Sequence, residues 1–158
     1  MSNSDLTHID ASGNAHMVDV SDRDVTERSA SASGKVVLSK SVLSLIAEGK
    51  APKGDVLATA RIAGIMGAKK TAELIPLCHP ISISSVNVDL EVAEDGVKIY
   101  STVKIADRTG VEMEALTAVS IAALTIIDMT KALDPAATIE YIQVDEKDGG
   151  RNGHWKRT

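Results

Sequence analysis

His79, in the segment Leu77-Cys78-His79-Pro80, is a candidate residue for acid-base chemistry. Imidazole suits proton transfer or phosphate contact because its unperturbed pKa is about 6.5. Pro80 disfavours helical geometry at His79, so the ring can project from an extended segment into a cleft. An ordinary surface histidine is the alternative.

Cys78 suggests a catalytic thiolate or a metal ligand, but no Cys-x-x-Cys partner exists, and a small buried residue is the favoured interpretation.

Two carboxylates, Glu112 and Glu114, stand at the start of a long apolar segment. Thr109 and Glu112 have the spacing of a capping box, so Glu112 is also compatible with a purely structural role. Glu114 precedes the segment Ala115 to Ile127, which contains no other charge and is predicted to be buried. Because buried carboxylates need partners, Glu114 is a candidate functional residue.

Asp128 and Lys131 lie three residues apart and therefore share one face of a helix. A surface ion pair worth a few tenths of a kcal/mol is the ordinary meaning of this spacing. Glu114 and Asp128 are 14 residues apart in the sequence, which places them about 21 Å apart along a helix axis. The site is therefore either elongated or built from the helices of two subunits, and we favour the second arrangement.

Several cations could bind an anionic ligand. Lys53 occupies a Pro-Lys-Gly turn before a predicted helix, where free backbone amides also attract phosphate, although such a lysine can equally be exposed to solvent. Lysines and carboxylates together predict an enzyme with a phosphorylated small-molecule substrate. The available cations are Arg28, Lys53, Lys69, Lys70, Lys131, Lys147 and Arg151.

The elements that must position these residues form a simple series. The order is strand, helix, helix, strand, strand, helix and strand, which fits an α+β fold with helices on one face of an antiparallel sheet. Glu94-Asp95-Gly96 predicts a hairpin turn between the two central strands. The predicted ranges are 25–38, 39–49, 55–70, 81–93, 96–105, 109–133 and 137–144.

A chain of 158 residues fits one domain, 1–158, with an N-terminal arm over 1–15 and a flexible loop and tail over 147–158. Phe is absent and aromatic residues make up 2% of the chain, so aliphatic side chains must fill the core and pack closely. Gly64 and Gly67 inside a predicted helix indicate that a backbone or a ligand approaches closely there. The longest helix, 109–133, is apolar on nearly every face and is expected to be buried all round.

Composition excludes several classes of function. A net charge of -5 argues against broad nucleic-acid binding, which requires a basic surface. The lone Cys78 cannot form an internal disulfide, and residues 1–8 lack a signal-peptide pattern, so we expect a cytoplasmic protein. The longest apolar stretch, Ala118 to Ile127, is about half of the roughly 20 residues that a membrane span needs, so no membrane insertion is expected.

The segments KGDVLATARIAGIMGAKKTAELIPLCHP and TGVEMEALTAVSIAALTIIDMTKA, together with His16-Met17-Val18-Asp19-Val20, resemble the molybdenum cofactor biosynthesis protein C family, the cyclic pyranopterin monophosphate synthases. The resemblance extends over about residues 16 to 153. It implies a ferredoxin-like α+β subunit that assembles as a homohexamer, a trimer of dimers, with its active site at the dimer interface.

The resemblance also implies a reaction. A lyase of this family converts (8S)-3',8-cyclo-7,8-dihydroguanosine 5'-triphosphate, a cyclised dihydro-GTP, to cyclic pyranopterin monophosphate and diphosphate in molybdenum cofactor biosynthesis, without redox change. No tightly bound cofactor and no metal site are implied, although Mg²⁺ can accompany the triphosphate.

Carried over residue by residue, the resemblance implies that Asp128 is the active-site residue and that Lys53 and Lys131 are catalytic lysines. It implies substrate contacts at Leu77, Cys78, His79, Met113 and Glu114, with further pocket positions at Glu112, Arg28 and Lys147. The chain departs from the family pattern at Ile127 and Thr130, where Tyr and Cys are usual, and at Asp148, Arg151 and Asn152, where Ser, Lys and Ser are usual.

Two other functions remain open from the residues alone. A non-catalytic pterin- or nucleotide-binding module would use His79 and Met113 without a proton-shuttling pair. A metal site formed by Glu112, Glu114, Asp128 and His79 is the other alternative, because carboxylates and imidazole bind divalent cations.

Overall fold

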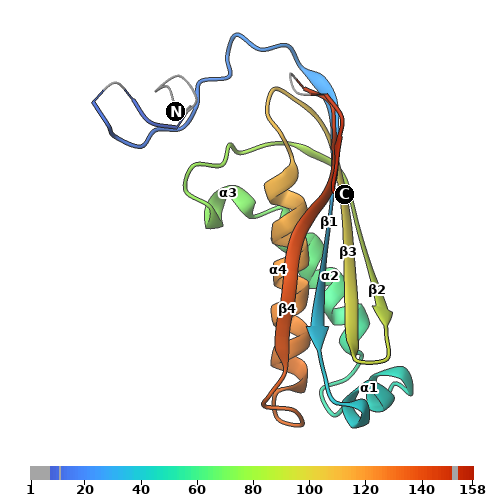
Figure 1. Cartoon of the computed structure of the whole chain (residues 1–158). Coiled ribbons are helices and arrows are strands. Elements are labelled where there is room, and N and C mark those ends of the chain that lie inside the picture. The colour runs from blue at the N-terminus through green and yellow to red at the C-terminus, as the bar shows by residue number, and fades with distance from the viewer. Residues whose placement is uncertain (1–7, 11, 151–152) are drawn as a thin grey trace.

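A five-stranded antiparallel sheet carries the helices on one face in this computed structural model (Figure 1). The structure describes residues 8–10, 12–150 and 153–158, so Arg151 and Asn152 lie outside the described residues, as does part of the N-terminal arm. The elements are β1 (Thr26–Val37), α1 (Lys40–Ala47), α2 (Val56–Ala68), α3 (Thr71–Leu74), β2 (Ile83–Val92), β3 (Gly96–Asp107), α4 (Glu112–Thr130), β4 (Thr138–Asp148) and β5 (Trp155–Lys156).

The strand order is β2-β3-β1-β4-β5, and each neighbouring pair is antiparallel. β3 lies between β1 and β2, so these two strands run in the same direction with a third strand inserted, which is the split βαβ arrangement of ferredoxin-like folds. This confirms the predicted α+β, ferredoxin-like fold with an antiparallel sheet and helices on one face. The short elements α3 and β5 were not predicted.

The sheet buries one face by strict alternation along β3, where Val97, Ile99 and Val103 are fully buried and Tyr100 is exposed. β1 contributes small side chains to the same buried face. A Cβ atom at Gly34 would lie 2.6 Å from Cγ1 of Val119, so the backbone of β1 touches a side chain of α4 directly. The predicted close packing of an aliphatic core is confirmed.

α2 and α4 pack against each other through glycines, as the sequence predicted. A Cβ at Gly64 would lie 2.8 Å from the carbonyl oxygen of Ala118, and one at Gly67 would lie 2.6 Å from Cγ1 of Ile121. Larger residues would force the helices apart. The glycines of α2 therefore serve helix packing and do not mark a ligand.

α4 is the central helix of the fold, but the expectation that it is buried all round is wrong. Ala115, Ala118 and Ile126 are fully buried, whereas Leu124 on the opposite side is 54% exposed. α4 is long and apolar enough to cross a membrane by length and composition alone, a test that the buried core helix of a soluble protein also passes. Its inner side packs on the sheet and on α2.

The last long strand continues beyond its predicted end at Val144 and includes Lys147, which pairs with Ala30 of β1. Lys147 also pairs with Trp155 of β5. The sequence placed Lys147 at the start of a loop because the pattern of apolar residues stops at Val144. Pairing with two other strands extends the regular structure past that point.

Candidate active site

The candidate site residues form two groups at opposite ends of α4. Asp128 and Lys131 lie at its C-terminal end with Lys53, while the remaining predicted residues gather around its N-terminal end. Glu114 and Asp128 are both within the helix, so the rise per residue separates them by about 21 Å along the axis. Within one chain the two groups therefore cannot act on the same atom.

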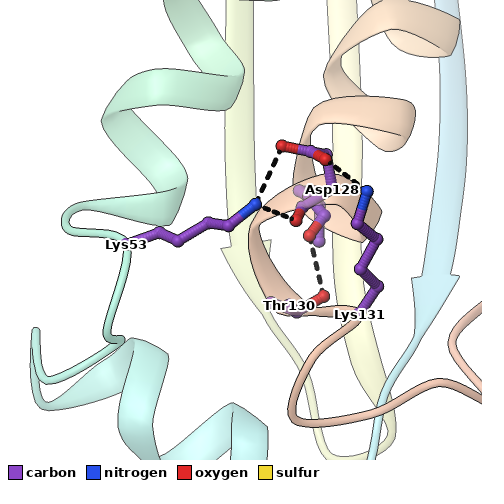
Figure 2. Close-up of polar contacts among 5 residues, drawn as sticks. Lys53, Asp128, Thr130 and Lys131 are labelled. Carbon is purple, nitrogen blue, oxygen red and sulfur yellow. Dashed lines mark hydrogen bonds and ion pairs between the residues drawn. The ribbon is translucent and has the colours of Figure 1, made fainter.

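The first group, which we call the lysine cluster, consists of Lys53, Asp128 and Lys131 (Figure 2). Lys53 lies in the loop before α2, and its Nζ donates to the main-chain carbonyl oxygen of Asp128 at 2.8 Å and to Oδ2 at 3.2 Å. Lys131, the C-cap residue of α4, donates from Nζ to Oδ1 of Asp128 at 2.7 Å. The last carbonyl groups of a helix lack partners within it, so Lys53 satisfies one of them from another segment.

The two ammonium groups lower the pKa of Asp128, with Lys131 the larger cause and Lys53 the second. Asp128 therefore stays ionised at neutral pH and holds two like charges close together. All three side chains are about half exposed, so the cluster adds little to stability and leaves both ammonium groups open to a ligand. Such a pair can bind phosphate and exchange protons.

At the other end of α4, six predicted substrate contacts line one cleft of about 420 Å³, a volume typical of small-molecule sites. The segment between α3 and β2 supplies one wall, the first turn of α4 supplies another, and the N-terminal segment with Val18, Val20 and Arg23 supplies a third. The six residues are Leu77, Cys78, His79, Glu112, Met113 and Glu114.

His79 ties the N-terminal segment to this cleft. Its Nε2 lies 2.7 Å from the carbonyl oxygen of Val18, and because a carbonyl only accepts, Nε2 carries the proton and donates it. In the neutral ring Nδ1 is then the acceptor, and it remains for other contacts. The loop histidine predicted from the sequence is thus partly buried and anchored.

Glu114 is 3% exposed, which agrees with the prediction that it is buried. Burial raises the pKa of Glu114 to about 7, and the nearby charge of Glu112 is a smaller cause of the same shift. A carboxyl group with such a pKa is present in both protonation states near neutral pH, so it can donate or accept a proton. Glu114 is therefore a candidate acid or base in the cleft.

Cys78 lies in the same cleft as a thiol. Burial raises its pKa, and the charge of Glu114 adds to the effect. The thiolate is therefore scarce at neutral pH, which argues against the alternative of thiolate catalysis.

The alternative metal site is not formed within one chain, because Asp128 lies at the other end of α4 from Glu114. Among the described residues no three His, Cys, Asp or Glu side chains lie close enough to hold a metal ion.

The structural alternative for Glu112, a capping box with Thr109, is not formed. α4 begins at Glu112, its N-cap is Val111, and no side chain caps it. The carboxylate of Glu112 instead pairs with Nζ of Lys147 on β4 at 3.0 Å, and both side chains are largely buried. Both residues line an adjoining cavity of about 330 Å³, which we call the side cavity.

Arg28 lines the side cavity and is held in place by β-strand neighbours. Its Nε donates to Oγ1 of Thr26 and to the carbonyl oxygen of Asp107, both at 3.1 Å. Gly150 also lines the side cavity, and its backbone has a positive φ of 75°. A Cβ atom at Gly150 would lie 2.6 Å from Nη1 of Arg28. The structure thus brings together Arg28, Glu112 and Lys147, as predicted, next to the cleft.

Arg23 lines both the cleft and the side cavity but was not singled out from the sequence. It lies in a segment without helical or strand periodicity, so no pattern drew attention to it. A signal was available, because Arg23 follows the segment His16 to Val20 that carries part of the family resemblance.

Comparison with known proteins agrees with the resemblance found in the sequence. Residues 17–150 match the model of the MoaC family. A cyclic pyranopterin monophosphate synthase of Streptomyces avermitilis is 63% identical over 153 residues, covering 97% of this chain and 90% of the relative. Those of Nocardioides sp. and Dinoroseobacter shibae are 60% and 58% identical over 155 residues, covering 96% and 97% of this chain and 95% and 98% of the relatives. The chain therefore belongs to the MoaC family.

Proposed function

We propose that this protein is a cyclic pyranopterin monophosphate synthase of molybdenum cofactor biosynthesis. It is a lyase that converts (8S)-3',8-cyclo-7,8-dihydroguanosine 5'-triphosphate to cyclic pyranopterin monophosphate and diphosphate. The observation that carries the proposal is identity of about 60% with enzymes of that name over nearly the whole chain. The predicted residues also gather into two chemically suitable half-sites.

The lysine cluster serves the phosphates. The rearrangement opens and recloses rings, so it needs proton transfers, and it releases diphosphate, so it needs cations where negative charge develops. In our proposal Lys53 and Lys131 bind phosphate and shuttle protons, and Asp128 holds both ammonium groups in place. The contacts of 2.7 to 3.2 Å from both lysines to Asp128 support these roles.

The cleft serves the guanine-derived ring. Glu114 exchanges protons with the ring, which its pKa of about 7 supports. Leu77, Cys78, His79 and Met113 contact the same part of the substrate from the cleft walls. Arg28 and Lys147 bind anionic groups from the side cavity, and Glu112 positions Lys147 through their ion pair.

A complete site takes one half from each of two neighbouring chains. We propose a homohexamer, a trimer of dimers, in which the lysine cluster of one chain faces the cleft of another. The separation of the half-sites along α4 supports this arrangement, and so do exposed apolar side chains on the helical layer. These side chains are Ile62, Met66 and Leu124, each more than half exposed.

The proposed enzyme is cytoplasmic and binds neither nucleic acid nor membrane. Its lone cysteine cannot form an internal disulfide, and its net charge of -5 does not favour nucleic acid. No tightly bound cofactor is needed, because the reaction involves no redox change, and Mg²⁺ can arrive with the triphosphate.

The decisive experiment supplies the purified protein with the cyclised dihydro-GTP and measures pterin and diphosphate. Both products should appear in equal amounts, whereas GTP, which lacks the 3',8 bond, should be inert. Binding without turnover would instead indicate a non-catalytic pterin- or nucleotide-binding module. Full activity after exhaustive chelation would count against a metal site.

A further inference from the structure

Arg23 stands at the junction of the two cavities. The cleft contains the predicted ring contacts, and the side cavity contains Arg28 and Lys147. Arg23 and Glu112 line both spaces. A ligand long enough to extend from one cavity into the other would therefore pass beside the side chain of Arg23.

One N–H donor of the Arg23 guanidinium has no hydrogen-bond acceptor among the described residues. Its Nε is shielded from solvent, yet no acceptor lies within hydrogen-bonding distance among the described residues. A guanidinium carries N–H donors and no acceptor, so only an acceptor atom can satisfy this group. A buried charged donor without a partner is costly, so a small rotation of the side chain that brings this N–H to an oxygen atom of a ligand would be favourable.

The backbone places Arg23 without help from a ligand. Its N–H donates to the carbonyl oxygen of Val20 at 3.1 Å in a tight turn. Oδ1 of Asp19 stabilises the same turn by accepting from the backbone N–H of Ser21 at 2.9 Å and from its hydroxyl at 2.6 Å. His79 fixes the segment just before this turn to the cleft wall. The position of Arg23 is therefore built into the fold.

The other cations of the side cavity already have protein partners. Nε of Arg28 donates to a hydroxyl and to a carbonyl oxygen, and Nζ of Lys147 pairs with Glu112. Among the described residues, three cationic side chains and two carboxylates, Glu112 and Asp148, line this cavity. The excess of positive charge favours an anion, and Arg23 is the cation whose Nε is left for it.

We propose that Arg23 is a substrate-binding residue that holds a phosphate group at the junction between the cleft and the side cavity. A planar guanidinium can donate two parallel hydrogen bonds to phosphate oxygens, which a lysine cannot do. The ring then lies in the cleft, and one phosphate group extends past Arg23 toward Arg28 and Lys147, while the others are left to the lysine cluster of the neighbouring chain. This inference rests on the proposed function for the identity of the substrate.

The test compares Arg23→Gln and Arg23→Lys with the wild type. Arg23→Gln should raise KM for the cyclised dihydro-GTP about tenfold with a smaller change in kcat, because one charge-assisted contact to bound substrate is lost. Arg23→Lys should recover part of the loss. Calorimetry with diphosphate and with guanosine as separate probes should show weaker binding of diphosphate only.

Arg108→Gln is the matched control, since Arg108 is an exposed arginine before α4 that lines neither cavity. It removes the same charge and should leave KM and diphosphate binding unchanged. Equal effects of Arg23→Gln and Arg108→Gln would overturn the inference, as would equal loss of guanosine and diphosphate binding or a lowered Tm in Arg23→Gln. If the wild type makes no pterin while diphosphate binding still depends on Arg23, the proposed function fails and the phosphate site stands.

Discussion

Lys53 donates a hydrogen bond to the main-chain carbonyl oxygen of Asp128 at 2.8 Å, so the loop before α2 is fastened to the last turn of α4. The same ammonium group lies 3.2 Å from the carboxylate of Asp128, which also holds Lys131. Three residues from two distant segments thus form one charged cluster. Its open position suggests that catalysis, rather than stability, depends on it.

Replacing either lysine of the cluster should therefore greatly lower the activity without unfolding the protein. Lys53→Ala or Lys131→Ala should lower kcat for diphosphate release about a hundredfold or more, which is typical for loss of a proton-transfer group. Lys50→Ala is the control, because Lys50 is an exposed lysine of the same loop that pairs with Glu48. Unchanged product yield in Lys131→Ala would refute the assignment.

Asp128→Asn tests the carboxylate that holds the two lysines. Because both ammonium groups lower the pKa of Asp128, its ion pairs contribute stability that is present above the ordinary pKa of about 3.8 and is lost as pH falls through the lower folded-state value. The variant should keep nearly the wild-type Tm at pH 7, because the cluster is exposed, but lose most activity. Thermal melts and product assays at that pH measure both, and a large drop in Tm would show a structural role instead.

Glu114→Gln tests the buried acid in the cleft. The wild-type rate should change with pH around 7, where Glu114 titrates, and the variant should lose this inflection along with activity. A pH–rate profile of kcat/KM for both proteins gives the answer. An identical inflection in the variant would assign it to another group.

The effect of rising pH on the free energy of unfolding should have opposite signs for Glu114 and Asp128. A raised carboxyl pKa favours the folded state at low pH, and this advantage is lost as pH rises from about 4.5 to about 7. Above that range Glu114→Gln should be more stable than the wild type by on the order of 3 kcal/mol, because no charge is buried. Denaturant titrations at pH 4 and pH 8 should show the difference almost entirely at the higher pH.

Complementation tests whether two chains share a site. Lys131→Ala and Glu114→Gln are each expected to be inactive, but random mixed dimers contain some sites built from two intact halves. About a quarter of wild-type activity should return after the two variants are unfolded together and refolded. Light scattering should give a mass six times that of the 16.6-kDa chain. No recovery of activity would place the whole site within one chain.

Gly150→Ala tests the closure of the side cavity. The new methyl group would collide with the guanidinium of Arg28, and a positive φ also disfavours alanine. We expect weaker substrate binding and a loss of about 1 kcal/mol in stability. Gly153→Ala is the matched control, because Gly153 also has a positive φ of 58° but nothing within 4 Å of a Cβ there. Equal KM values in the two variants would show that strain alone matters.

Local chemistry in the sequence determined the order of the long elements and the burial of the core. The alternation from Val97 to Ile105 and the apolar segment from Ala115 to Ile127 report directly on β3 and α4, because each periodicity reflects contacts on one face of a single element. The family motifs likewise placed Lys53, His79, Glu114 and Asp128 among the candidates. The short elements α3 and β5 were not predicted, because segments of four and two residues are too short to show a periodic pattern.

Only the tertiary structure decided which candidates meet. Glu112 fits a local capping box, yet it pairs with Lys147, which is 35 positions away in the sequence and reaches it through strand pairing of β4. Arg23 has no local pattern, and its place between two cavities depends on a turn docked against His79. Sequence patterns record the interactions of neighbours along the chain, whereas these contacts arise when packing brings distant segments together.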